Sequence, residues 1–385
     1  MCNVRCDIFC RVIDNYGDIG VCWRLARQLA AEQHYAVDLW VDDLAAFARL
    51  CPAVVPTLPT QTLDGVTIRH WCSPFAARDG AAAQLVIEAF ACALPDAYVQ
   101  AMATRLPPPA WINLEYLSAE PWVASHHGLP SPHPRLPLTK YFFFPGFSAG
   151  TGGLLREADL LDRRRRAAPH RAWAELELPA PLQGQTQVSL FCYDNPALAP
   201  LLQAWSQHAA PLRCLVTPGA AQQQVAAWLD RPQFTVGDQA QRGPLTLYAL
   251  PFLAQPRYDQ LLWACDLNLV RGEDSFVRAQ WAARPLLWQA YPQAEQAQRL
   301  KVEAFVDVYC AGLPTGASAA WRQLMVVWNE NSDAAPASAA SLAVTWQACW
   351  EQRQVLAAHA NTWAEELAST EDLVTRLVKF IEPLI

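Results

Sequence analysis

The sequence predicts an α/β protein with two open, Rossmann-like domains that face each other across a cleft, followed by helices at the C-terminal end. Apolar segments rich in strand-forming residues alternate with helical periodicity in both halves, which is typical of parallel sheets covered by helices on both faces. The alternation fails between residues 128 and 185, where prolines are frequent. The length of 385 residues also suits two domains of ordinary size.

The N-terminal half begins with the apolar segment CDIFCRVI at residues 6–13, which we expect to form a strand. The polar segment DNYGDIG at 14–20 contains turn-forming residues, and the segment at 21–33 returns to helical periodicity through Leu25 and Leu29. We predict further strands at 35–41, 66–71, 84–90 and 111–117, and a helix at 95–105.

The C-terminal half repeats this alternation. We predict strands at 187–193, 212–218, 245–252, 266–274 and 285–291. We predict helices at 196–208, 220–229, 258–265, 275–284 and 293–311, and helical structure to the end of the chain through 342–359 and 371–381. The expected organisation is an N-terminal domain at 1–150, a linker at 151–184, a C-terminal domain at 185–360, and a terminal helix at 361–385 that packs back on the N-terminal domain.

The net charge is −7 with histidines neutral, from 29 basic and 36 acidic residues. This balance argues against a general nucleic-acid binder, which needs a basic domain or stripe. One basic run, Arg163 to Arg166, lies in the predicted linker. We interpret it as a solvated face; a docking site for an acidic partner is the alternative.

The N-terminus shows no basic segment followed by an apolar one, and no uncharged apolar stretch reaches about 18 residues, so we expect neither a signal peptide nor a membrane span. The 12 cysteines contain no C-x2-C pair, which argues against a metal site. Cys2, Cys6 and Cys10 recur every fourth residue, so a strand would place them on one face. We interpret the cysteines as buried free thiols of a cytoplasmic protein.

The segment after the first strand is a candidate site, because ligands of open α/β folds bind outside the carboxyl ends of the strands. Gly17 and Gly20 let the backbone approach a ligand, and the helix N-terminus offers N–H groups to an anion. Asp14 and Asp18 could supply a general base and its supporting charge. The alternative stays open that Asp14 starts a turn and Asp18 caps the helix. The segment lacks G-x-G-x-x-G, so a dehydrogenase is not favoured.

A second candidate site is RGEDS at 271–275, where a predicted strand gives way to a helix. Arg271 and a helix N-terminus suit phosphate oxygens, and the carboxylates of Glu273 and Asp274 suit sugar hydroxyls, so the pattern favours a sugar diphosphate. The alternative is an N-cap at Asp274 or Ser275 beside an internal pair between Arg271 and Glu273.

Aromatic residues follow two other predicted strands. Phe191 and Tyr193 end one strand, and Phe252 with Gln255 follows another. Aromatic rings there suit stacking on a nucleobase, and Gln255 suits reading the base edge, although each residue taken alone fits an ordinary core. No two aspartates are separated by a single residue, so the D-x-D metal clamp of one large class of nucleotide-sugar enzymes is missing, and we expect no metal site.

Two segments, DNYGDIGVCWRLARQLA at 14–30 and LVRGEDSFVRAQWA at 269–282, resemble a known family. They are similar to EarP, the bacterial protein-arginine rhamnosyltransferases of elongation factor P, and the resemblance extends more diffusely over the whole length. It implies a GT-B fold in which the N-terminal half binds the acceptor and the C-terminal half binds dTDP-β-L-rhamnose. It also implies transfer of rhamnose, with inversion and without metal or cofactor, to an arginine of elongation factor P, which activates this factor for the rescue of ribosomes stalled at polyproline.

The matching motifs imply roles for individual residues. Asp18 becomes the general base, Asp14 its partner, and Glu273 lies close to the reaction. Phe252 and Gln255 would hold the thymine, and Tyr193 would face the diphosphate. The predicted donor contacts are Asn15, Tyr16, Gly17, Tyr193, Phe252, Gln255, Arg271, Glu273, Asp274 and Ser275.

Two rival functions stay open at this point. One is a GT-B glycosyltransferase with a small-molecule or lipid acceptor, and the other is a non-catalytic two-domain ligand-binding protein. The pair Asp14 and Asp18, together with Glu273, favours an enzyme. The missing signal peptide disfavours a periplasmic binding protein.

Overall fold

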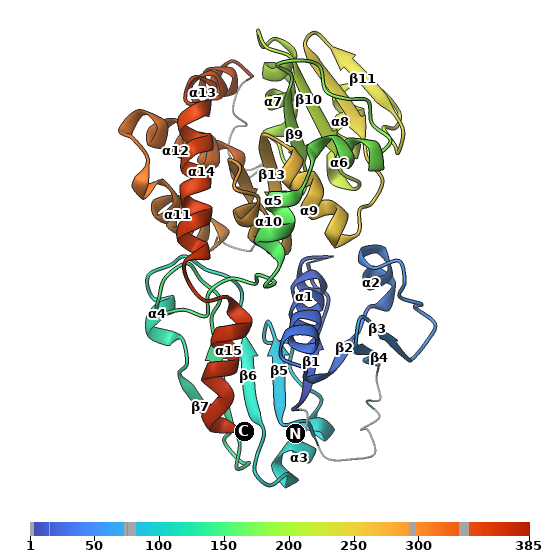
Figure 1. The fold of residues 1–385 in the computed structure, drawn as a ribbon, viewed down its shortest axis with the longest axis vertical. Coiled ribbons are helices and arrows are strands. Elements are labelled where there is room, and N and C mark those ends of the chain that lie inside the picture. Colours follow the sequence, from blue (N-terminus) through green and yellow to red (C-terminus); the bar gives the residue numbers. More distant parts are fainter. Residues whose placement is uncertain (1–3, 15, 73–74, 76–81, 293–296, 331–338) are drawn as a thin grey trace. The chain divides into compact units, whose positions relative to one another are not determined.

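A computed structural model of the protein describes residues 4–14, 16–72, 75, 82–292, 297–330 and 339–385. The chain divides into two compact units, Met1–Leu160 with Ala368–Ile385, and Leu161–Leu367. Each unit contains one sheet in which parallel pairs predominate, with helices joining the strands (Figure 1). The predicted α/β class is confirmed.

The sheet of the N-terminal unit has the strand order β3-β4-β2-β1-β5-β6-β8-β7 within the described residues. Its strands are β1 (Arg5–Cys10), β2 (Ala36–Val41), β3 (Thr60–Leu63), β4 (Val66–His70), β5 (Leu85–Ala89), β6 (Ala110–Leu114), β7 (Pro130–Pro132) and β8 (Thr139–Phe143). The pairs are parallel except β3 with β4 and β7 with β8, at the two edges. β1 is central and almost entirely buried, which explains why four of its six residues are apolar.

The helices of this unit include one from the far end of the sequence. They are α1 (Gly17–Glu32), α2 (Leu44–Leu50), α3 (Asp96–Thr104), α4 (Val123–His126) and α15 (Leu373–Ile381), followed by the 3-10 turn η3 (Glu382–Leu384). The ring of Phe380 in α15 lies 5.8 Å from that of Phe143 in β8, and Arg376 donates to the Thr151 carbonyl at 2.6 Å. The last helix therefore returns to the N-terminal unit, as we expected.

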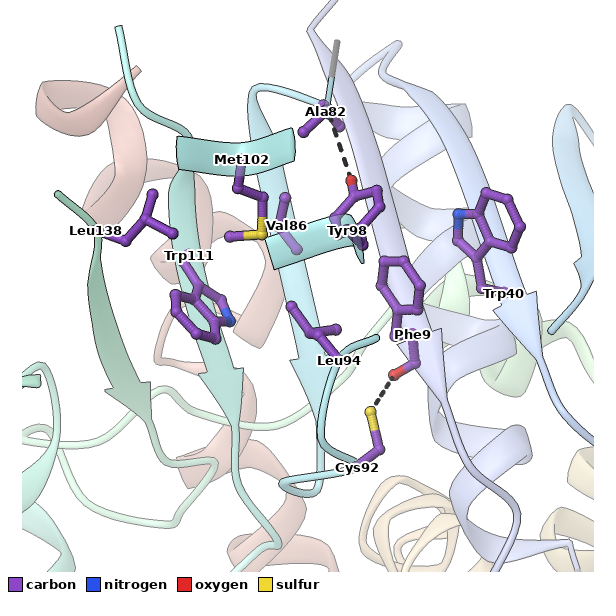
Figure 2. Packing of buried hydrophobic residues seen from close by; sticks show 11 residues of the cluster. Phe9, Trp40, Ala82, Val86, Cys92, Leu94, Tyr98, Met102, Trp111 and Leu138 are labelled. Carbon is purple, nitrogen blue, oxygen red and sulfur yellow. Dashed lines mark hydrogen bonds between the residues drawn. The ribbon is translucent and has the colours of Figure 1, made fainter. Parts of the chain in front are cut away.

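An aromatic cluster holds β1 in place. Phe9 of β1 stacks on Trp40 of β2 with ring centroids 5.6 Å apart, and Tyr98 of α3 meets Phe9 edge-on at 4.7 Å (Figure 2). The Tyr98 hydroxyl donates to the buried carboxylate of Asp7, and burial raises the pKa of Tyr98. Fully burying one large apolar side chain contributes about 1.5–3 kcal/mol. This packing fixes β1 and therefore the start of the polar segment that follows it.

The sheet of the C-terminal unit has the order β11-β12-β10-β9-β13-β14 within the described residues. Its strands are β9 (Thr186–Leu190), β10 (Leu212–Val216), β11 (Gln239–Arg242), β12 (Leu245–Ala249), β13 (Leu267–Arg271) and β14 (Leu286–Gln289). Its helical elements are α5 (Leu160–Arg166), α6 (Pro169–Glu175), α7 (Leu198–Ser206), α8 (Ala220–Trp228), α9 (Gln255–Ala264), α10 (Asp274–Ala282), α11 (Ala297–Tyr309), η2 (Cys310–Gly312), α12 (Thr315–Trp328), α13 (Ala339–Glu351) and α14 (Arg353–Ala368). The pairs are parallel except β11 with β12.

Several predicted boundaries are wrong for physical reasons. α1 begins at Gly17 instead of residue 21, because Gly20 N–H already donates to the Tyr16 carbonyl at 2.9 Å and closes the first turn. β6 ends at Leu114 instead of residue 117, because its ladders with β5 and β8 end there. The stretch 128–185, where we expect the alternation to fail, contains the short elements β7, β8, α5 and α6. The prolines of β7 are tolerated because β7 is an edge strand.

The described cysteines are free thiols, as predicted. Most are buried, including Cys6 and Cys10, and burial raises the pKa of Cys6; Cys51 is half-buried and Cys72 is exposed. Cys2 lies outside the described residues. None of the described helices combines the length and the apolar character that crossing a membrane requires.

Candidate active site

The segment between β1 and α1 lies at the point where the strand order of the N-terminal sheet reverses. From β1 the chain continues through α1 to β2 on one side, and it later adds β5 on the other side. In an open parallel sheet this reversal creates a crevice at the carboxyl ends of the strands, where ligands bind. Asp14 precedes α1 and Asp18 lies in its first turn, so both predicted catalytic residues lie at the strand-order reversal.

The carboxylate of Asp18 is buried, with 2% of the residue exposed. Its Oδ2 accepts hydrogen bonds from the backbone N–H groups of Ile13 and Asp14, both at 2.8 Å. Its Oδ1 accepts from the Tyr116 hydroxyl at 3.1 Å. These three donors fix the orientation of the carboxylate. The alternative that Asp18 caps the helix is wrong, because the N-cap residue is Tyr16.

Asp14 is buried as well and is tied to the start of α1. Its carbonyl accepts from the Gly17 N–H at 2.6 Å, which closes the turn before the helix, so Asp14 does start a turn. A Cβ atom at position 17 would lie 2.5 Å from Asp14 Oδ2, so this close approach of the carboxylate requires glycine. Tyr16 and Gly17 therefore accompany Asp14 in one turn, whereas Asn15 lies outside the described residues.

Tyr116 is a site residue that the sequence analysis missed, because the predicted strand ran through residue 117. Since β6 ends at Leu114, Tyr116 instead lies beyond the carboxyl end of the strand, where its hydroxyl reaches Asp18. Its ring stacks on Phe90 with centroids 4.3 Å apart. Phe90 has a φ of 55°, which is rare for a bulky residue. The change from apolar INL to EYLS was the signal that could have marked this position.

The C-terminal sheet has its own reversal point, between β9 and β13. Arg271 ends β13, and Phe191 and Tyr193 follow β9. The Arg271 guanidinium carbon lies 4.3 Å from the ring centroid of each of these two residues. A guanidinium held at its faces keeps its in-plane N–H donors directed outward, the arrangement that suits a phosphate. Burial raises the pKa of the intervening Cys192 to about 12, so this thiol stays protonated at neutral pH.

The turn from β13 into α10 holds the rest of the predicted RGEDS site. Gly272 has a φ of 60°, a conformation that favours glycine. The Ser275 hydroxyl donates to the carbonyl of Arg271 and accepts from its N–H at 3.1 Å. Glu273 is the N-cap residue and makes no side-chain capping bond, while Asp274 and Ser275 lie in the first turn. The alternative of a cap at Asp274 or Ser275 is therefore wrong.

Gln255 links this turn to the neighbouring helix. It is the first residue of α9, is 3% exposed, and donates through Nε2 to Asp274 Oδ2 at 3.0 Å. Phe252 is half-buried in the short segment that joins β12 to α9. The structure thus brings together Gln255 with Asp274, and Tyr193 with Arg271.

A buried ion pair between α9 and α10 escaped the sequence analysis. Arg278 donates through Nε and Nη2 to the two carboxylate oxygens of Asp259, at 3.0 Å and 2.7 Å, and each side chain is 1% exposed. Such bidentate pairs have a well-defined geometry. This pair therefore fixes the two helices whose first residues are Gln255 and Asp274. In the sequence, neither Arg278 nor Asp259 differs from an ordinary polar residue of a helix.

Among the residues that the structure describes, no group of three or more His, Cys, Asp or Glu side chains is arranged to hold a metal ion. The groups at the C-terminal reversal point that suit a diphosphate are Arg271 and the N–H groups in the first turn of α10, a helix of nine residues.

Comparison with known proteins identifies the family. The family described as "Elongation-Factor P (EF-P) rhamnosyltransferase EarP" matches residues 6–382. The chain belongs to the EarP family. The protein-arginine rhamnosyltransferase of Pseudomonas aeruginosa is 50% identical over 379 residues, 97% of this chain and 98% of that protein. A solved structure from work on EarP-mediated arginine glycosylation of translation elongation factor EF-P has 34% identity and a TM-score of 0.69, and covers 100% of both chains.

EarP membership confirms the resemblance found in the two sequence segments, and it makes the protein an enzyme of the glycosyltransferase class. The spinosyn rhamnosyltransferase SpnG shares the fold, with a TM-score of 0.53 at 14% identity over 98% of this chain and 100% of that chain. The predicted GT-B fold with two Rossmann-like domains is confirmed. Neither rival function is favoured by these similarities.

Proposed function

We propose that this protein transfers rhamnose from dTDP-β-L-rhamnose to an arginine side chain of elongation factor P in the cytoplasm, with inversion and without a metal ion. The modified factor then acts on ribosomes stalled at polyproline. In this proposal the domain at 1–150 binds the acceptor and the domain at 185–360 binds the donor. EarP membership supports the sugar and the acceptor. The observation that carries the mechanism is the buried carboxylate of Asp18, held by three hydrogen-bond donors.

An arginine acceptor is chemically demanding, because its guanidinium stays protonated and its lone pairs are delocalised. A fixed carboxylate at Asp18 attracts the guanidinium, orients one nitrogen towards the sugar and concentrates positive charge near itself. Asp14 adds a second carboxylate from the same turn, which strengthens the attraction for a cation. The role of the N-terminal pair is therefore to bind and polarise the acceptor.

The transfer exchanges one bond for another. The arginine nitrogen forms a bond to the anomeric carbon of rhamnose, while the bond from that carbon to the diphosphate oxygen breaks and dTDP leaves with the electron pair. The attacking nitrogen becomes strongly acidic as its lone pair is used for bonding. Asp18 then accepts the proton. Attack opposite the leaving group inverts the configuration.

In this proposal the donor is held mainly by residues of the C-terminal unit. Arg271 and the first turn of α10 stabilise the charge that develops on the leaving diphosphate, and Tyr193 lies beside Arg271 to complete the phosphate site. The carboxylates of Glu273 and Asp274 hold sugar hydroxyls, with Glu273 nearest the reaction, and Ser275 supports the turn. Further contacts with the thymine come from Phe252 and Gln255, and with the donor from the N-terminal turn, Asn15, Tyr16 and Gly17.

Mass spectrometry of elongation factor P, incubated with the protein and dTDP-rhamnose, tests the function directly. We expect a mass gain of one deoxyhexose on a single arginine, and no gain when that arginine is replaced by lysine. Unfolded elongation factor P, or a short peptide containing the arginine, distinguishes recognition of a folded protein from recognition of a small acceptor. Hydrolysis or binding of the donor without transfer to protein would contradict the proposal.

Metal independence has a separate test. Turnover is expected to be unchanged in excess EDTA, because Arg271 and the α10 N-terminus supply the positive charge that a metal ion supplies in D-x-D enzymes. Activity that EDTA abolishes and Mg²⁺ or Mn²⁺ restores would contradict this part of the proposal.

A further inference from the structure

The C-terminal unit contains a cavity that none of the predicted donor contacts lines. Its volume is about 680 Å³, and α5, α6, α9 and the end of α10 contribute its wall. In Figure 1, α5 lies along α10, and the Arg164 side chain of α5 donates to the Trp281 carbonyl of α10 at 2.7 Å. The charged residues that line the cavity are Arg163, Arg164, Arg166, Arg171, Arg284 and Glu175.

This cavity concentrates positive charge in a protein whose net charge is −7. Five arginines against one glutamate leave its lining with a net charge of +4. Burial and the neighbouring guanidiniums of Arg165 and Arg284 lower the pKa of Arg164, while Glu365 acts in the opposite direction. Arg165 forms an ion pair with Asp162, so part of the local charge is balanced there. The guanidiniums that line the cavity repel one another, and an anion would relieve this repulsion.

The size and chemistry of the cavity limit the anion. A volume of about 680 Å³ falls in the range of small-molecule sites, roughly 300–1,000 Å³. Guanidinium groups match phosphate oxygens in a bidentate manner, and several arginines around one cavity suit several phosphates. Trp263 also lines the cavity and provides an aromatic surface beside the arginines.

We propose that this cavity is a second ligand site, which binds a small anion carrying at least two phosphate groups. The basic run from Arg163 to Arg166, interpreted from sequence as a solvated face, is then part of the wall of a binding site. The proposal does not depend on the transferase activity, because the cavity and the predicted donor contacts share no residue. Inorganic polyphosphate and a nucleoside polyphosphate share the required chemistry.

Calorimetric titration with sodium tripolyphosphate in low-salt buffer tests the site. All proteins carry Arg271→Ala, which removes the main side-chain cation of the predicted donor site. The cavity variant adds Arg171→Gln and Arg284→Gln. The matched control instead adds Arg135→Gln and Arg231→Gln, which remove the same charge at two exposed positions outside the cavity. ATP serves as a second probe. If the site is built for a nucleoside polyphosphate, ATP should bind more tightly than tripolyphosphate; if it is built for inorganic polyphosphate, ATP should not.

We expect tripolyphosphate to bind the Arg271→Ala protein and the control equally, and the cavity variant at least about tenfold more weakly, since charge-assisted hydrogen bonds are lost. Melting temperatures measured without anion check folding, and the cavity variant is expected to melt no lower than the control, because like charges have been removed. Equal affinity in the cavity variant and the control, or no binding to the Arg271→Ala protein, would overturn the proposal. A polyglutamate peptide that binds more tightly than tripolyphosphate, and loses affinity in the cavity variant, would overturn it in favour of an acidic protein segment.

Discussion

The two points where the strand order reverses share one backbone arrangement but present side chains of opposite charge. In each unit a central parallel strand ends, a short polar turn follows, and a helix begins without a side-chain cap, at Tyr16 in one unit and Glu273 in the other. In the N-terminal unit, backbone N–H groups and a tyrosine hydroxyl surround the carboxylate of Asp18. In the C-terminal unit, two aromatic rings hold the guanidinium of Arg271.

This difference shows how the same strand-turn-helix unit can suit ligands of opposite charge. Hydrogen-bond donors hold the carboxylate of Asp18 in a fixed orientation, so in the proposed function the turn before α1 suits a cation such as an arginine acceptor. Aromatic faces hold a guanidinium without neutralising it, so in the proposed function the turn before α10 suits an anion such as a diphosphate. In the proposed function the strand-turn-helix geometry determines where the ligand group sits, and the charged residue there, Asp18 in the first turn of α1 or Arg271 at the end of β13, determines which charge the ligand carries.

The largest expected effect is a loss of stability when the buried ion pair beside the C-terminal turn is broken. Asp259→Ala leaves the Arg278 guanidinium buried without its carboxylate, which should lower the free energy of unfolding by about 3–5 kcal/mol in urea denaturation. Glu303→Ala, which breaks the exposed pair between Arg299 and Glu303, is the matched control and should lower the free energy of unfolding far less, because solvent screens an exposed pair. Similar losses in the two variants would mean that the buried pair does not fix α9 and α10.

Asp18→Asn should have the next largest effect and tests the charge of the N-terminal turn. Asparagine keeps the shape and an acceptor oxygen for the backbone N–H groups, but it removes the negative charge and the base. We expect turnover to fall about 100-fold or more, with donor affinity and melting temperature near wild type. The control Asp43→Asn changes a true N-cap residue, which accepts from the Ala46 N–H, and should remain fully active. An active Asp18→Asn enzyme would contradict the mechanism.

The C-terminal turn is tested by donor binding. Arg271→Ala should weaken the binding of dTDP more than that of thymidine, because the proposed partner of the guanidinium is the diphosphate. Phe252→Ala should weaken dTDP and thymidine alike, by about 1–3 kcal/mol if the ring stacks on thymine. Titration calorimetry with both ligands measures these differences. Unchanged dTDP affinity in both variants would remove the donor site from this turn.

Much of this comparison could be predicted from the sequence. The segments at 14–18 and 271–275 stood out because polar and glycine residues follow continuous apolar runs, and the structure places both at reversal points. Pairings across elements could not be predicted. The bond between Arg278 and Asp259, for example, depends on α9 packing beside α10, a relation that helical periodicity does not encode.

Most of the remaining differences between prediction and structure are errors in where a helix begins or a strand ends. The helix after β1 was predicted to begin at residue 21, because Gly17 and Gly20 suggested a continuing turn, although glycines are compatible with a first helical turn whose N–H groups need no helical partner. The strand that became β6 was extended to residue 117, since strand formers continue past Leu114, and this hid Tyr116 inside a predicted strand. Sheet partners, not the propensity of the strand itself, decide where it ends.

The smallest expected effect tests whether the hydrogen bonds to Asp18, and not only its charge, matter for the N-terminal turn. Tyr116→Phe removes one of three donors to the carboxylate and retains the ring that stacks on Phe90. The net contribution of such a bond is about 0.5–1.5 kcal/mol, so turnover should fall roughly two- to tenfold while dTDP affinity stays unchanged. Tyr141→Phe, which removes a hydroxyl from β8 of the same unit, should leave turnover at the wild-type level. Single-turnover transfer to elongation factor P distinguishes the outcomes: full activity in Tyr116→Phe, together with an inactive Asp18→Asn, would show that the backbone donors alone orient the carboxylate.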